Sequence, residues 1–502
     1  MSTLSMIAHG FSVSLTIQNL IACIIGVIIG TLTGVLPGLG VTGAIALLLP
    51  LSYGMDATSA LIMFAGIYYG AMYGGSTTSI LVNLPGEAAS VITAIDGHAM
   101  AKKGRAGAAL AIAAIGSFVA GTLGLIGLTL FAPPLAKAAL AFGPPEFFAI
   151  AILGLIILSN LTGTSVLKSI LMVFVGIMLG TIGTDTIAGV NRFTFNIDEL
   201  QRGIDFAVLA MGIFGIPEVI SAITEPSQDA IIQKVRFREL YPNKEEIKRS
   251  LAPMFRGGVV GFLCGLIPGP SATISTFLSY ALEKRWSKHP EEFGKGAVEG
   301  VAGPESANNA ATSATMIPLL SLGLPFAPPS ALLLTGFIIH GITPGPTLIT
   351  QYPSIFWGLI ASMYIGNILL LIINLPLVGV FASLLKTPIQ ILMPVITIIT
   401  LTGAYAVNNS LFDLWLLILF GVTGYFMKKG GYEPAPLAIG LVLGPTLERG
   451  LTQGLIMGDG NLLYFFIRPI SGTILVITLL ILSFIVVRWL GITLKKRTAE
   501  VK

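Results

Sequence analysis

Two stretches of this 502-residue chain gather small polar side chains inside apolar sequence. They are GGSTTSILVNLPG at residues 74–86 and GPESANNAATSATMIPLLSLGLP at residues 303–325. Hydroxyl, amide and carboxylate oxygens can coordinate a small cation such as Na⁺, and free backbone N–H groups at a helix start can bind an anion. The candidate binding residues in these stretches are Gly75, Ser76, Thr77, Thr78, Ser79, Asn83, Pro85, Glu305, Asn308, Asn309, Thr312 and Ser313.

A Pro-Gly pair precedes each polar stretch, in GVLPGLG at 34–40 and in GLIPGPS at 265–271. Such pairs between apolar runs end one helix and allow another to begin, and broken helices of this kind lie beside cavities in transporters. The further candidate binding residues are Pro37, Gly38, Gly40, Pro268, Gly269 and Ser271.

The polar stretches must be positioned by helix ends. We interpret Gly74-Gly75 and Gly303-Pro304 as breaks after which new helices start, because Ser, Thr and Asn favour N-caps and Pro suits a first turn. The two helix N-termini would then bind an anion without Arg or Lys. For any single Ser or Thr, the alternative is a hydrogen bond to its own backbone or to a neighbouring helix.

Three carboxylates beside the motifs, Glu305, Glu299 and Asp96, have two open interpretations. They either bind ions or protons, or they lie at a wet interface, because a charge at mid-membrane costs about 2.5–3.5 kcal/mol.

The composition predicts an all-α integral membrane protein. Hydrophobic residues make up 54% of the chain and charged residues only 10%, whereas a soluble domain carries about 25% charged residues. Lipid leaves open backbone groups unsatisfied, and the long apolar runs do not alternate as strands of a membrane barrel would. We expect about 12 transmembrane helices plus re-entrant or broken segments.

The order of the motifs predicts an internal duplication with opposite orientation of the two halves. Loops after the first motif of half one (52–57) and after the second motif of half two (340–346) lack Lys and Arg, whereas loops 97–105 and 283–295 are basic. Because basic loops stay cytoplasmic, equivalent loops would lie on opposite sides, as in two inverted-topology repeats. The expected units are an N-terminal membrane repeat (1–224), a cytoplasmic amphipathic connector (225–256), a C-terminal membrane repeat (257–490) and a basic cytoplasmic tail (491–502).

Several function classes are not supported by the residues. The net charge of +4 is spread over loops, which predicts orientation signals and no nucleic-acid binding. The two cysteines lie in separate apolar segments and are expected to be buried thiols. No metal-ligand spacing, P-loop or catalytic nucleophile pattern is found, so we expect no enzyme activity, no resident metal and no cofactor.

Longer stretches resemble the large membrane subunit of tripartite tricarboxylate transporters, the TctA type. They are GVLPGLG (34–40), NLPGEAASVITAIDGHAMAKKGRAG (83–107), FLSYALEKRWSKHPEEFGKGAVEGVAGPESANNAATS (277–313), APLAIGLVLGPTLERGL (435–451) and GDGNLLYFFIRPI (458–470). The resemblance covers essentially the whole chain. One departure is Phe326-Ala327-Pro328-Pro329, where the family usually has small residues, so citrate should not be assumed as the substrate.

The resemblance implies a multi-pass importer of carboxylates in the bacterial inner membrane. Its implied partners are a small TctB-type membrane subunit and a periplasmic TctC-type solute-binding protein, and its implied energy source is an ion gradient. A trivalent anion entering against 100 mV meets roughly 7 kcal/mol, so we expect several cations to be co-transported, Na⁺ rather than H⁺. Alternatives from the residues are an anion-selective channel or a transporter of another small polar solute, and a dimer stays open.

The two predicted repeats, with the polar motifs meeting near the bilayer midplane, also suit alternating access. We expect a core that carries the motifs to move relative to a scaffold formed by helices such as 354–376 and 471–487, with the connector and the C-terminus in the cytoplasm.

Overall fold

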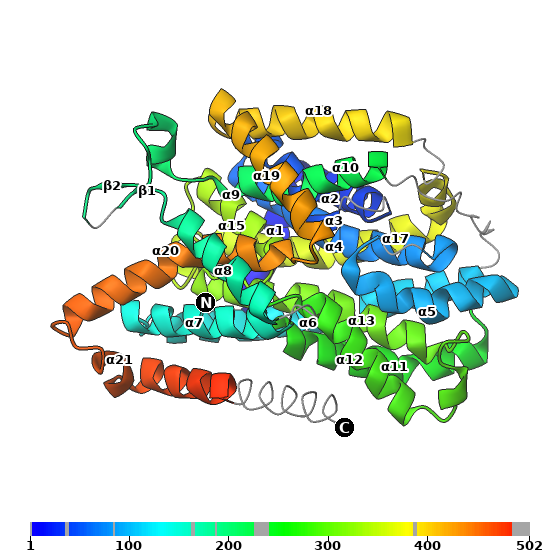
Figure 1. Ribbon diagram of the computed structural model, residues 1–502. Coiled ribbons are helices and arrows are strands. Elements are labelled where there is room, and N and C mark those ends of the chain that lie inside the picture. Colours follow the sequence, from blue (N-terminus) through cyan, green and yellow to red (C-terminus); the bar gives the residue numbers. More distant parts are fainter. Residues whose placement is uncertain are drawn as a thin grey trace, which may run out of the picture.

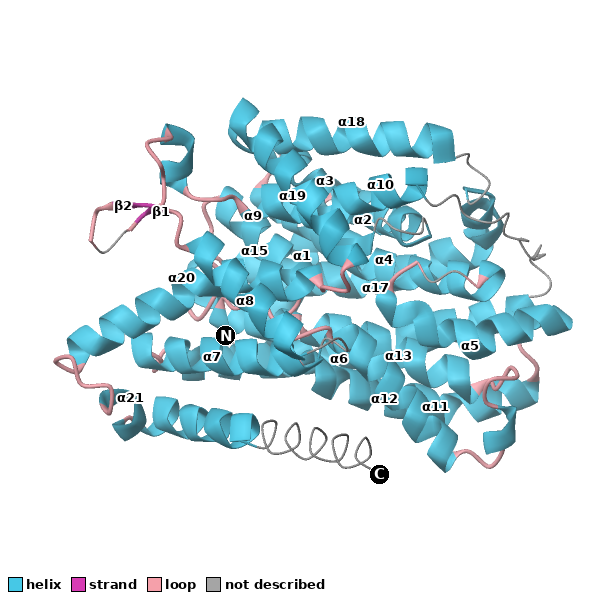
Figure 2. Cartoon of the chain, in the orientation of Figure 1, coloured by secondary structure: helices cyan, strands magenta, loops and turns pink. Residues whose placement is uncertain are grey.

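The computed structural model is built of helices that run mostly alongside one another (Figure 1). It describes residues 3–35, 40–83, 86–161, 166–185, 188–224, 240–384 and 389–483. Within these residues the strands are the short antiparallel pair β1 (Gly183–Thr184) and β2 (Asn191–Arg192), at one edge of the molecule (Figure 2). The all-α prediction is therefore confirmed.

The described part of the first half contains ten α-helices and several short helical turns. The α-helices are α1 (Thr3–Ser14), α2 (Ile17–Val35), α3 (Gly40–Leu48), α4 (Ala57–Val82), α5 (Val91–Met100), α6 (Ala106–Ala139), α7 (Pro144–Leu161), α8 (Val166–Gly180), α9 (Phe206–Ala210) and α10 (Ile216–Thr224). The short turns are η1 (Leu49–Gly54), η2 (Ala88–Ser90), η3 (Ala101–Arg105), η4 (Asp198–Arg202) and η5 (Met211–Gly215).

The described part of the second half follows with eleven labelled α-helices. They are α11 (Lys244–Gly265), α12 (Ser271–Trp286), α13 (Glu299–Ala314), α14 (Met316–Leu322), α15 (Pro328–Ile339), α16 (Leu348–Gln351), α17 (Pro353–Leu384), α18 (Ile389–Asn408), α19 (Leu411–Lys429), α20 (Pro434–Met457) and α21 (Tyr464–Ile467). A short turn η7 (Pro290–Glu292) and an apolar helix at Pro469–Ser483 complete the described elements.

Four described helices are long and apolar enough to cross a membrane: Ile17–Val35, Ala88–Ala139, Pro353–Leu377 and Leu411–Lys429. Six shorter apolar helices accompany them. The Pro and Gly residues divide other apolar stretches into short pieces, as between α14 and α15. The chain thus has the helices of a multi-pass membrane protein, and the number of about 12 spans stays a prediction.

The helices α4 and α13, which carry the polar stretches, lie inside the protein. Every residue of α13 is buried, and α4 is buried from Ser59 to Val82. Polar side chains on these helices therefore face protein and not lipid, which is the only setting in which a membrane interior tolerates many of them.

Glycines allow α4 to pack directly against α2. A Cβ atom at each of three α2 glycines would lie 2.2–2.5 Å from a backbone oxygen of α4, so only glycine permits this separation. The paired positions are Gly26 with Met63, Gly30 with Ile67, and Gly34 with Ala71. Because residue numbers rise together, α2 and α4 run parallel.

The same arrangement occurs between α11 and α13. A Cβ atom at each of three α11 glycines would lie 2.1–2.5 Å from a backbone oxygen of α13. The paired positions are Gly257 with Gly303, Gly261 with Ala307, and Gly265 with Ala311. Residue numbers again rise together, so α11 and α13 also run parallel.

The structure has helix breaks at the Pro-Gly pairs but none where the polar stretches begin. Helix α11 ends at Gly265 and α12 starts at Ser271, with Gly269 at φ 135°, a conformation that glycine adopts easily. Helix α2 ends at Val35 and α3 begins at Gly40. Pro37 and Gly38, between them, lie outside the described residues, as does Pro85.

The polar stretches themselves do not start helices, which corrects the predicted N-termini. Ser76, Thr77, Thr78 and Ser79 lie in the last two turns of α4, and Glu305 lies in the second turn of α13, after Gly303 and Pro304 inside that helix. The reason is packing, because Gly74 and Gly303 are required for close approach between helices and do not interrupt the backbone. A Cβ atom at Gly74 would lie 2.4 Å from Thr31 O, and one at Gly303 would lie 2.7 Å from the Glu283 side chain.

Only part of the expected connector (225–256) lies within the described residues, and the expected tail (491–502) lies outside them. Residues 225–239 of the connector also lie outside them. Asn243 caps α11 by accepting a hydrogen bond from Glu246 N at 2.8 Å, and the helix then continues to Gly265. The boundary expected at residue 256 therefore falls inside a continuous helix.

Candidate functional site

The two polar stretches meet where α4 and α13 pack side by side in opposite directions. The Tyr68 hydroxyl lies 3.3 Å from Thr315 Oγ1, and the Asn308 amide donates to Met72 O at 3.5 Å. Ser76 contacts Glu305. Because residue numbers rise on α4 while they fall on α13, the two helices are antiparallel at this contact.

Glu305 is the centre of this contact. Its side chain is fully buried and accepts hydrogen bonds from two hydroxyls, those of Ser76 on α4 and Thr93 on α5. The carboxylate of a second-half helix is thus held by two helices of the first half. Both stretches were predicted to contribute to one site, and the geometry brings Ser76 and Glu305 together.

A second carboxylate, Glu87, lies next to it in the turn between α4 and η2. The Asn308 side-chain amide donates to Glu87 Oε1 at 3.0 Å. We call Ser76, Glu87, Thr93, Glu305 and Asn308 the crossing cluster. The cluster combines two carboxylates, two hydroxyls and one amide, and no Lys or Arg hydrogen-bonds either carboxylate among the described residues.

Small residues allow the Glu87 turn to reach α4. A Cβ atom at Gly75 would lie 2.8 Å from the Glu87 side chain, and one at Gly86 would lie 2.0 Å from Gly34 O. The turn therefore packs against the C-terminal end of α2 and against α4 about two turns before that helix ends. The end of α2 carries partial negative charge from its free carbonyls, which favours a cation.

Several buried polar atoms around the cluster have no hydrogen-bond partner within the described part of the chain. On α4 and in the cluster itself they are Tyr73 OH, Ser79 Oγ and Asn308 Oδ1. An unpartnered buried polar atom costs about 1–3 kcal/mol, so a native protein rarely keeps several in one place without a use for them. Oxygen atoms with free lone pairs beside two carboxylates can ligate a small hard cation or a proton.

The other candidate residues have different surroundings. Asn309 donates to the Ser117 hydroxyl of α6 at 2.7 Å and so anchors α13. Thr78, Thr312 and Ser313 donate to carbonyls of their own helices at 3.0–3.2 Å, which is the alternative considered for single residues. Asn83 is the left-handed C-cap of α4, with φ 59°.

The described candidate residues of the Pro-Gly segments form no hydrogen bond with the crossing cluster. Gly269 N donates to Phe326 O at 2.8 Å, and Pro268 packs beside Gly154 of α7. Gly40 has φ 57°, and a Cβ atom added to it would have no neighbour within 4 Å. Ser271 starts α12 and is buried, and Thr77 is buried in α4. None of these residues hydrogen-bonds the described members of the cluster.

Thr93 and Ser117 were not predicted, and Asp96 was left open between two interpretations. Thr93 lies inside the long family-like motif at 83–107, but nothing in its type separates it from a helix-packing threonine. Ser117 lies in a run of small apolar residues on α6. Only the packing of α13 against α5 and α6 reveals what these hydroxyls contact.

Asp96 has a structural role on α5, at the basic end of the molecule. Its Oδ1 accepts from three backbone N–H groups, those of Gly294, Gly296 and Ala297, at 2.7–2.9 Å. Its Oδ2 accepts from the Tyr280 hydroxyl at 2.9 Å. The fully buried carboxylate thus holds the loop between α12 and α13 against the first half.

Asp96→Asn should lower the free energy of unfolding by about 2 kcal/mol, because an amide group would face donors that need an acceptor. The check is the thermal unfolding midpoint of the purified chain in detergent. Asp459→Asn is the matched control, since Asp459 lies exposed in a turn where Asn also fits. Equal midpoints for both variants would contradict the role assigned to Asp96.

Ion pairs gather at this same end. Arg249 of α11 donates to Glu292 at 2.6 Å and to Glu299 at 2.8 Å, and the Lys103 ammonium donates to Lys295 O at 2.6 Å. The hydrogen bond from Arg249 lowers the pKa of Glu292, so this pair stays charged at neutral pH. The basic loops of both halves therefore form one charged end, toward the right in Figure 1.

Comparison with known proteins gives the family. Residues 20–439 match the tripartite tricarboxylate transporter TctA family. The chain is 48% identical over 479 residues to an uncharacterized 52.8 kDa protein in the TAR-I ttuC' 3'region of Agrobacterium vitis, with 95% of each chain covered. It is also 49% identical over 215 residues to an uncharacterized protein in the TAR-II ttuC' 3'region of the same organism, covering 43% of this chain and 89% of that protein. No solved structure matches. Because the family match covers most of the chain, including the helices of both halves that form the interior polar site, this protein belongs to the tripartite tricarboxylate transporter TctA family.

Proposed function

We propose that this chain is the large permease subunit of a binding-protein-dependent secondary transporter that imports di- or tricarboxylates, with a cation gradient as its energy source. TctA proteins are transporter subunits and not enzymes, and they work with TctB and TctC subunits. The proposed partners are accordingly a small TctB-type membrane subunit and a periplasmic TctC-type solute-binding protein, in the bacterial inner membrane. The observation that carries the proposal is the buried crossing cluster, in which helices of both halves share Glu305.

The crossing cluster is the proposed cation site. Two carboxylates, unpartnered oxygens and the C-terminal end of α2 all favour positive charge there. This replaces the helix N-terminal anion site expected from the sequence. We keep Na⁺ as the proposed ion, because neutral oxygens of Ser, Thr, Tyr and Asn outnumber the two carboxylates; H⁺ is the alternative.

The two halves are proposed to be inverted-topology repeats. The support is threefold: α2 is parallel to α4, α11 is parallel to α13, and α4 is antiparallel to α13 at the cluster. Equivalent helices that run oppositely are what an inverted repeat requires. Alternating access would then change the contact between α4 and α13 and so open the cluster to one side at a time.

Reconstituted transport tests the function. The purified chain with its small subunit in liposomes, supplied with citrate- or succinate-loaded binding protein, should accumulate labelled carboxylate only when an inward Na⁺ gradient is imposed. Moving one charge against 100 mV costs about 2.3 kcal/mol, so a negative interior should not stop uptake if several cations accompany the anion. Uptake that responds to pH alone would reject Na⁺, and uptake indifferent to both gradients would reject cation coupling.

A further inference from the structure

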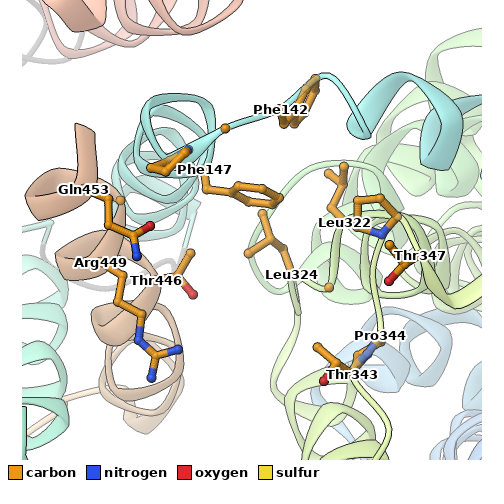
Figure 3. Close-up of a pocket in the computed structure, with 15 residues that line it drawn as sticks. Phe142, Phe147, Leu322, Leu324, Thr343, Pro344, Thr347, Thr446, Arg449 and Gln453 are labelled. Atoms are coloured by element: carbon orange, nitrogen blue, oxygen red, sulfur yellow. The ribbon is translucent and has the colours of Figure 1, made fainter. Parts of the chain in front are cut away.

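A second polar site lies at the end of the molecule away from the charged loops. A cavity of about 450 Å³ opens between α20, the start of α7 and the segments that follow α14 and α15 (Figure 3). This volume is in the range that holds a small organic ligand. The cavity is distinct from the crossing cluster, because Leu322 lies 17 residues beyond Glu305, about 25 Å along the two helices.

One wall of the cavity is polar and belongs to a single face of α20. Thr446, Arg449 and Gln453 are three and four residues apart, and Figure 3 shows their side chains on the same side of the space. Thr343 and Thr347 add hydroxyls across from them. The rest of the lining beside these threonines is apolar and includes Phe142, Phe147, Leu322 and Leu324.

Arg449 is the one ionisable residue among those lining the cavity. Neighbouring arginines are paired: Arg192 contacts Glu448, and Arg468 donates to Glu146 at 2.7 Å. Arg449 makes no hydrogen bond or ion pair with the described part of the chain. The cavity is therefore positively charged, with a planar group that binds carboxylates through two parallel hydrogen bonds.

The position of the cavity indicates which side of the membrane it faces. Helix α6 starts after the basic loop at 101–105 and has 34 residues, about 51 Å, whereas the hydrocarbon core of a bilayer is about 30 Å thick. The cavity residue Phe142 lies just beyond the far end of that helix. Because basic loops stay cytoplasmic, the cavity would face the periplasm.

We propose that this cavity is an outer carboxylate-binding subsite, in which Arg449 holds the anion before it passes to the interior of the protein. The inference rests on the proposed function for the direction of transport. The guanidinium neutralises a carboxylate, the hydroxyls of Thr343 and Thr347 and the Gln453 amide hydrogen-bond its remaining oxygens, and the apolar wall contacts its carbon chain. Since Leu322 and Leu324 end the α13–α14 segment, an anion seated here touches the same continuous segment that carries Glu305.

Cysteine protection measures occupancy without relying on transport. Both native cysteines, Cys23 and Cys264, are buried, so Thr446→Cys would supply an accessible thiol in the cavity. A membrane-impermeant methanethiosulfonate added to the periplasmic side should label it, and citrate should protect it. Thr350→Cys, at the same end but outside the cavity, should be labelled without protection.

Arg449→Gln in the Thr446→Cys background should raise the citrate concentration for half-maximal protection by roughly tenfold or more, because a charge-assisted hydrogen bond is lost. Arg449→Lys should lie in between, since it keeps the charge but not the planar fork. Arg285 is an exposed arginine in the last turn of α12, at the other end of the molecule, so Arg285→Gln should leave protection unchanged.

Absence of protection in a chain that still transports citrate would overturn the subsite. So would protection that is indifferent to Arg449→Gln. Labelling of Thr446→Cys that is blocked by the small subunit itself would make the cavity a subunit interface and also overturn it. If the complex takes up no carboxylate but citrate still protects the thiol, the proposed function fails while the binding site stands.

Discussion

Glu305→Gln should abolish cation-driven carboxylate uptake while the protein still folds. The variant keeps the size of the side chain, and the hydroxyls of Ser76 and Thr93 can turn to accept from or donate to the amide, so the contact between α4 and α13 survives. What is lost is the charge. Removing one partner from a buried charge pair costs about 3–5 kcal/mol, which corresponds to a hundredfold or greater loss of cation affinity.

The measurement is the Na⁺ dependence of uptake in proteoliposomes, with gel filtration to show that the variant is folded. Glu291→Gln is the matched control, because Glu291 is an exposed carboxylate at the charged end with 66% of its side chain accessible. Carboxylate exchange between the two sides of the membrane adds a second readout. Exchange that persists without concentrative uptake would indicate a proton carried on Glu305, and wild-type Na⁺ dependence would contradict the cation site.

Gly261→Ala should destabilise the protein by about 3 kcal/mol, at the upper end of what overpacking usually costs. The new Cβ atom would lie 2.1 Å from Ala307 O, and a backbone carbonyl of a fully buried helix cannot rotate out of the way. The helices α11 and α13 would have to separate, which would displace α13 and with it the crossing cluster. Thermal unfolding of the purified chain and the yield of folded protein give the measurement.

Gly43→Ala is the control with the opposite expected sign. Gly43 is helical in α3 with nothing within 4 Å of its Cβ position. Alanine is favoured over glycine in a helix by about 0.8–1.0 kcal/mol, so this variant should be neutral or slightly more stable. A similar loss of stability in both variants would mean that glycine content, and not the close contact of α11 with α13, determines the stability.

Much of the architecture could be predicted from residue types alone. The low charge content and the long apolar runs were sufficient to predict helices, since lipid permits few other structures. Glycines four residues apart, as at 26, 30 and 34, are typical of close helix packing, and α2 indeed lies against α4 through them. The pairing of the two polar stretches was also a sound hypothesis, because Ser76 and Glu305 are in contact.

The direction of the helices at the site could not be predicted. Gly74-Gly75 and Gly303-Pro304 have the residue types of a helix start, yet they lie inside α4 and α13. A glycine beside a polar run fits a break or a close contact equally well, and only the neighbouring helix decides between them. This difference removes the exposed helix N-termini that were expected at both polar stretches, and the two carboxylates that meet there change the proposed ligand of the site from an anion to a cation.

By itself, then, the sequence determined that the chain is helical and apolar, that its polar residues are gathered in two stretches, and which family it resembles, because these properties depend on composition and local order. Only the tertiary structure decided that Glu87 and Thr93 join Glu305, that Asp96 holds a loop, and that Arg449 is left unpaired in a cavity among the described residues. Each of these depends on contacts between residues far apart in the chain, such as the 212 positions that separate Thr93 from Glu305, and no local pattern encodes which distant side chains will meet.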